Sequence, residues 1–167
     1  MGKVLVAFYS SAGTTRKAGQ AIAAALGADI EDIQEVEPRH LDARGPGGLR
    51  KVGRIILAGG EAQMGRTRPI LPSKYNPADY DLVVIGTPIW GSCLTGAARA
   101  YIERHKDQFK AVAFFRTGLN PKPSLRCFRQ MERACGKAPK ATANFDADKV
   151  NAGDSAAEVQ EFVSKLT

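Results

Sequence analysis

Histidine and cysteine are scarce in this chain, which has two histidines and three cysteines among 167 residues. Cys93, Cys127 and Cys135 form no CxxC pair and are odd in number, so neither a zinc site nor a disulfide framework is predicted. Neither His40 nor His105 has a metal-ligand spacing such as HExxH. We therefore expect reduced thiols, no metal, and a structural role for His105 on the apolar side of its predicted helix.

Long apolar runs are also missing. Hydrophobic residues make up 44% of the chain, but no run approaches the roughly 20 residues that span a bilayer. Because Lys3 already begins a predicted strand, no signal peptide is expected. The length suits one α/β core better than two. The sequence thus predicts a single soluble domain over residues 1–167, in the cytoplasm and without a membrane partner.

Acidic residues are outnumbered, 17 against 24 basic ones, which leaves a net charge of +7. Such a charge suits an acidic protein partner, a phosphate-bearing ligand or nucleic acid. The locally basic stretches 39–54 and 66–74 do not interleave aromatic residues, as a surface for single strands would. We expect a solvated basic face and no nucleic-acid partner.

The segment Val4–Thr15, VLVAFYSSAGTT, is the most informative stretch that is present. Its pattern predicts a strand, a tight turn and a helix start, where unpaired N–H groups and the helix dipole can hold an anion. Gly13 lets the backbone approach a phosphate. The loop lacks the GK[ST] of a P-loop and the spaced glycines of a dinucleotide fingerprint, so a phosphomonoester is the favoured ligand. The alternative is a turn that binds nothing.

Strands and helices alternate along the rest of the chain. This alternation predicts right-handed βαβ crossovers and a doubly wound α/β domain with a five-stranded parallel sheet and helices on both faces. Strands are expected at 3–9, 29–34, 81–86, 110–115 and 141–145, and helices at 14–26, 97–106, 124–135 and after a capping box formed by Ser155 and Glu158.

Three loops of unusual composition follow strands of this sheet: Ser10–Thr15, Thr87–Cys93 and Arg116–Asn120. Ligands of such sheets bind at the carboxyl ends of the strands, so we expect these loops to converge. The segment 37–79 is too long for a structureless connection. It is predicted to be an insertion over about 38–79, with a helix at 49–63.

The motifs together resemble the flavodoxin family of FMN proteins. The resemblance is carried by Val4–Leu26, by YDLVVIGTPIWGS at Tyr80–Ser92, and by AVAFFRTG at Ala111–Gly118. It implies a sheet of order 2-1-3-4-5 with FMN as cofactor at the point where the strand order reverses.

The resemblance also implies which residues surround the cofactor. The FMN phosphate would lie in the loop of Ser10, Ser11, Ala12, Gly13, Thr14 and Thr15. The isoalloxazine and ribityl chain would lie beside Thr87, Pro88, Ile89, Trp90 and Gly91, with Arg116, Thr117 and Gly118 on the other side. The indole of Trp90 is a flat surface suited to stacking on a flavin; a core or rim aromatic is the alternative. No catalytic acid or base is predicted.

Three features depart from the family pattern: Ala12 stands where a threonine is usual, the insertion precedes the third strand, and the chain is basic. The predicted function is electron transfer through FMN, with an acidic redox protein or a small molecule as partner. The alternatives are an NAD(P)H-dependent quinone or flavin reductase and a binding module that has lost FMN.

Overall fold

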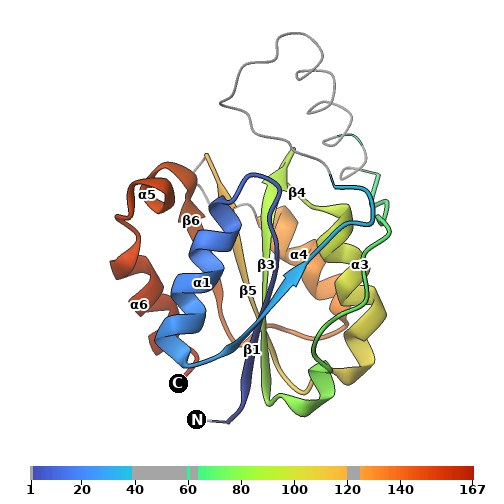
Figure 1. The fold of residues 1–167 in the computed structure, drawn as a ribbon, viewed down its shortest axis with the longest axis horizontal. Coiled ribbons are helices and arrows are strands. Elements are labelled where there is room, and N and C mark those ends of the chain that lie inside the picture. Colours follow the sequence, from blue (N-terminus) through green and yellow to red (C-terminus); the bar gives the residue numbers. More distant parts are fainter. Residues whose placement is uncertain (1, 39–59, 61–63, 120–124) are drawn as a thin grey trace, which may run out of the picture.

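Five parallel strands form the centre of the computed structural model, which describes residues 2–38, 60, 64–119 and 125–167 (Figure 1). The strands lie in the order β2-β1-β3-β5-β6, and a short strand β4 pairs with β3. With β4 set aside, this is the predicted order 2-1-3-4-5. The bounds are β1 Val4–Tyr9, β2 Asp29–Ile33, β3 Leu82–Trp90, β4 Cys93–Leu94, β5 Val112–Gly118 and β6 Thr142–Asp146.

Helices cover both faces of the sheet (Figure 1). One layer holds α1 (Thr14–Leu26), α5 (Ala147–Ala152) and α6 (Ala156–Ser164), and the other holds α3 (Gly96–His105) and α4 (Leu125–Cys135). Short 3-10 turns, η1 and η2, lie at Pro77–Asp79 and Lys106–Gln108. Within the described ranges, no helix is long and apolar enough to cross a membrane.

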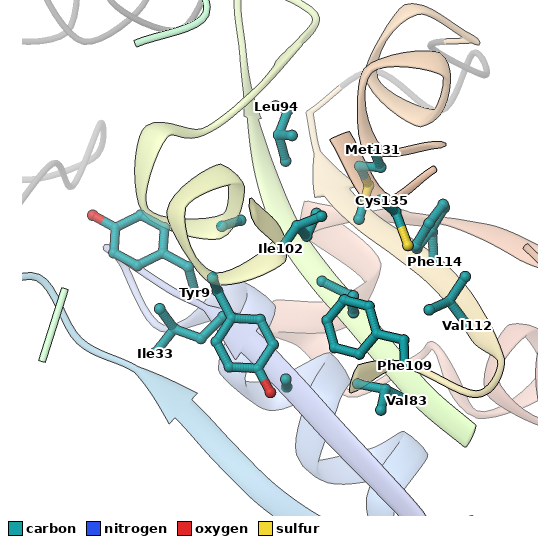
Figure 2. Close-up of a cluster of buried hydrophobic side chains, with 14 of the residues drawn as sticks. Tyr9, Ile33, Val83, Leu94, Ile102, Phe109, Val112, Phe114, Met131 and Cys135 are labelled. Atoms are coloured by element: carbon teal, nitrogen blue, oxygen red, sulfur yellow. The ribbon is translucent and has the colours of Figure 1, made fainter. Parts of the chain in front are cut away.

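The core is divided into two apolar clusters, one on each side of the sheet. Alternate residues of β1 supply both: Val4, Val6 and Phe8 point to one face, and Leu5, Ala7 and Tyr9 to the other. Figure 2 shows the cluster beneath α3 and α4, including Tyr9, Ile102 and Met131. Because both faces are buried, β1 is apolar throughout, and β3 and β5 are apolar as far as Gly86 and Phe115.

The start of the last helix differs from the prediction. Ser155 precedes α6, but its side chain makes no capping hydrogen bond. Glu158 instead accepts a hydrogen bond from Lys149 Nζ at 2.6 Å, so the expected capping box is wrong. Lys149 lies on α5, a helix that was not predicted and that begins where the Asp146 carboxylate accepts from the N–H groups of Asp148 and Lys149.

The third strand is longer than predicted. Thr87 and Pro88 were expected to end it, yet β3 continues to Trp90 because both residues pair with β5. Pairing with β1 ends at Gly86, so the missing N–H of Pro88 falls where β3 has no neighbour on that side. The chain then reverses through Gly91 and Ser92, whose φ values of 57° and 64° suit a two-residue hairpin turn, into β4.

Two other predicted segments need comment. Arg116–Gly118 were expected in a loop but complete β5, because Arg116, Thr117 and Gly118 pair with β6. The helix expected at 49–63 lies outside the described residues except for Gly60, which is helical and accepts a hydrogen bond from the Met64 N–H at 3.0 Å. After that segment the chain returns to the end of β2, where Glu35 and Ile70 form an antiparallel bridge.

Replacing Gly86 by alanine should destabilise the fold by about 1–3 kcal/mol. An added Cβ would overlap the ring of Phe115, which is fully buried and has no room to move. The midpoint of urea unfolding measures this effect. A second variant, Gly86→Ala with Phe115→Leu, should lose less than the sum of the two single changes. A wild-type midpoint for Gly86→Ala would contradict the prediction.

Candidate functional site

The loop between β1 and α1 presents the start of a helix to open space. Gly13 is the N-cap residue of α1 and has a φ of 91°, a conformation that favours glycine. Its N–H donates to Ser10 Oγ at 3.1 Å. No side chain caps the helix start, and no described atom lies within 4 Å of the position that a Cβ on Gly13 would take. The first N–H groups of α1 can therefore receive an anion.

Two hydroxyls of this loop bind other elements. Thr15 Oγ1 lies 2.7 Å from Thr117 Oγ1 in a buried hydrogen bond that joins α1 to β5. Thr14 Oγ1 donates to Asn151 Oδ1 at 3.3 Å. Asn151 belongs to α5 and was missed from the sequence, although Asp146 is a typical N-cap residue that could have indicated this helix.

The end of β3 is fixed to the start of α3 by two buried threonines. Thr87 Oγ1 donates to the carbonyl of Pro88 at 2.9 Å and lies 2.9 Å from Thr95 Oγ1. A hydroxyl has one proton to donate, so Thr95 is the donor to Thr87. This arrangement holds the hairpin that follows in a defined position.

Trp90 lies in this hairpin and is half-buried. Its ring packs edge-to-face on Tyr9, with centroids 6.0 Å apart and an interplanar angle of 82°. On the other arm of the hairpin, the N–H of Leu94 donates to Gln130 Oε1 of α4 at 2.8 Å. The indole is therefore supported by β1, while its hairpin is attached to α4.

Arg116 is a buried cation below the same edge. It is 1% exposed, and burial lowers the pKa of its guanidinium from a reference value far above neutral pH. The neighbouring Cys127 thiol has its pKa raised to about 12 by burial and is protonated at neutral pH. A Cβ on Gly118 would lie 2.7 Å from Ile89 Cγ1 and 3.4 Å from Arg116 Nη1, so the guanidinium reaches the end of β5.

The three predicted segments lie together at the carboxyl ends of the strands, as expected. Thr87 pairs with Arg116 and Pro88 with Thr117 across β3 and β5, and the bond between Thr15 and Thr117 adds the first loop. Their contacts with a ligand stay predictions. A separate groove of about 630 Å³ between α1 and α5–α6 contains none of the predicted residues.

A doubly wound sheet with an anion-receiving loop and an aromatic hairpin at its switch point defines a class of nucleotide-binding α/β protein. A flavodoxin family model matches residues 3–166. The chain belongs to the flavodoxin family, and the predicted family, fold and FMN cofactor are confirmed.

Solved structures share this architecture. A candidate flavoprotein from Bacteroides eggerthii is 26% identical, with a TM-score of 0.71 over 94% of this chain and 99% of that one. A Lactobacillus acidophilus flavoprotein in complex with FMN is 18% identical, with a TM-score of 0.68 over 91% of this chain and 98% of that one. The latter likeness concerns the fold alone. Among curated proteins, no significant sequence match is found.

The residues of the site fit FMN. The open space at Gly13 and the uncapped start of α1 suit its phosphate. A Cβ at Gly118 would lie 2.7 Å from Ile89 Cγ1, so glycine is needed there for the end of β5 to pack closely against Ile89. Trp90 offers an aromatic surface, and Arg116 provides a buried positive charge nearby. These features match an anionic group at one end of the ligand and a flat ring at the other.

Proposed function

We propose that this protein transfers electrons through FMN bound at the carboxyl edge of the sheet. Bound FMN supplies the redox chemistry, and the chain supplies binding, orientation and electrostatic environment. The observation that carries the proposal is the buried hydrogen bond between Thr15 and Thr117, because it joins the anion-receiving loop to the strand that carries Arg116.

Each segment has a separate task in this proposal. The N–H groups at the start of α1 bind the phosphate, with Ser11 and Thr14 as nearby hydroxyls. The hairpin holds Trp90 against the ring, supported by Tyr9. Thr87 uses its proton within the hairpin and so acts by positioning. Arg116 remains charged at neutral pH and favours the negative charge that a flavin gains on reduction.

FMN should bind far more tightly than riboflavin, by about 100-fold or more. Riboflavin lacks the phosphate, so the charge-assisted hydrogen bonds of the loop are lost, and a loss of about 3 kcal/mol corresponds to roughly this factor. Titration of the apoprotein with each ligand, monitored through the quenching of flavin fluorescence, measures the difference between the two affinities. Equal affinities for FMN and riboflavin, or FMN fluorescence that the apoprotein does not quench, would refute the proposed site.

The protein's role as a carrier or a reductase is decided by a turnover assay. We propose the carrier, which should oxidise NADH or NADPH slowly in the presence of quinone but exchange electrons with a partner protein. Rapid nicotinamide oxidation would instead indicate the reductase. A cytoplasmic location is part of the proposal and is supported by the three free, buried cysteines.

A further inference from the structure

Three arginines form a stripe on the outer surface of α4. Arg126, Arg129 and Arg133 are spaced by three and four residues, so they share one face of the helix, and all three are exposed. We call them the arginine stripe. The stripe extends over about 10 Å along the helix. Helix α4 lies beside α3 on one face of the sheet (Figure 1).

The helix that carries the arginine stripe contacts the candidate site. Gln130, adjacent to Arg129, accepts a hydrogen bond from the N–H of Leu94 on the hairpin that carries Trp90. The inner face of the same helix places Cys127 next to Arg116. A protein that bound the stripe would therefore lie beside the Trp90 hairpin.

The stripe has no acidic counterpart in the described part of the chain. Basic residues on other elements form close pairs, as Arg16 does with Asp32 at 2.8 Å and Lys165 with Glu161 at 2.7 Å. Neither Glu132, on the same helix, nor any other acidic residue that the structure describes forms an ion pair with the three arginines. Their charge is available to a partner.

Two of the three arginines are placed unfavourably for the helix that carries them, whereas Arg133 lies in the last turn, where the helix dipole favours a cation. Arg126 and Arg129 are like charges three residues apart, and Arg129 and Arg133 are like charges four residues apart. Arg126 also lies in the first turn, where the helix dipole disfavours a cation, and no acidic residue offsets it there. Because helix stability does not account for this arrangement, recognition of an anionic partner is the better explanation.

We propose that the arginine stripe binds an acidic patch on the redox protein that exchanges electrons with this site; the inference rests on the proposed function. Arginine is enriched at protein interfaces and binds carboxylates through two parallel hydrogen bonds. Leu125, at the end of the stripe nearest the site, is 60% exposed and supplies apolar contact. A protein surface with carboxylates around an apolar centre matches both features better than a nucleic acid does.

The variant Arg129→Glu tests the proposal without weakening the helix. A glutamate at this position would attract both neighbouring arginines and repel Glu132 three residues on, so the thermal midpoint should change little. The probe is an acidic plant-type ferredoxin, a small [2Fe–2S] protein, titrated into the ¹⁵N-labelled FMN-loaded protein and followed by amide shifts. At low ionic strength the variant should bind it roughly tenfold more weakly than wild type.

Lys140→Glu is the matched control. Lys140 is exposed and has no ion pair with a described residue, and its N–H donates to the Val112 carbonyl at the start of β5, the end of the sheet opposite the Trp90 hairpin; the same change of charge should therefore alter affinity by less than about twofold. Equal losses in both variants would overturn the proposal, as would amide shifts that avoid α4 and the hairpin, or no binding by wild type.

Two further measurements distinguish an acidic protein partner from other anionic partners, and the docking surface from the proposed function. If Arg129→Glu weakens binding to single-stranded DNA or to vesicles of anionic phospholipid but leaves ferredoxin binding unchanged, the proposed class of partner is wrong. If the fluorescence of FMN is not quenched when FMN is mixed with the apoprotein, the proposed function fails. The amide titration, repeated without FMN, still measures the docking surface by itself.

Discussion

Replacing Gly13 by valine should raise the Kd for FMN by about 100-fold or more while leaving the fold intact. The Gly13 backbone has a φ of 91°, which a β-branched residue adopts only with strain. The valine side chain would also enter the open space in front of α1, where the phosphate meets the N–H groups. Calorimetry with FMN measures the loss, and far-ultraviolet circular dichroism checks the fold.

Gly27→Val is the control for strain alone. Gly27 ends the same helix, has a φ of 60°, and likewise has no described atom within 4 Å of an added Cβ. Both variants should lose about 1–2 kcal/mol of stability, but only Gly13→Val should lose FMN. If Gly13→Val keeps wild-type affinity, or both variants lose FMN equally, the loop of residues 10–15 is only a turn.

Removing the charge of Arg116 should lower the midpoint potential of bound FMN by about 30 mV or more. A unit charge about 12 Å from the flavin would contribute roughly 1.4 kcal/mol at an effective dielectric constant near 20, which equals about 30 mV for a two-electron couple. Arg116→Met keeps an apolar chain in a position that is 1% exposed. A spectroscopic redox titration against dyes of known potential measures the shift.

Arg104→Met provides the comparison for net charge alone. Arg104 is exposed and donates to the backbone carbonyls of Ile70 and Leu71. Its removal should change the potential little, and salt should abolish the change. The effect of Arg116 should persist in salt because this residue is buried. Equal shifts from the two variants would show that Arg116 acts only through the net charge of +7.

The residue pattern alone indicated the buried strands and the helix that follows the first loop, and the resemblance to the flavodoxin family supplied the order of the strands. Helix α1 begins at Thr14 and ends at Leu26 as predicted, because Gly13 and Gly27 mark its two ends in the sequence and in the structure. The buried strands were equally clear, since β1 and β3 are apolar on both faces. The motifs were local, so local patterns sufficed to indicate the family.

How far the strands continue and which side chains meet depend on tertiary pairing, which the sequence pattern did not reveal. Thr87, Pro88 and Arg116 are typical of loops or surfaces, but pairing between β3 and β5 places them in strands and buries Arg116. The hydrogen bonds from Thr15 to Thr117 and from Thr14 to Asn151 join residues more than 100 positions apart. No periodicity in the sequence encodes such contacts, because they depend on how the right-handed crossovers bring distant strand ends to one edge.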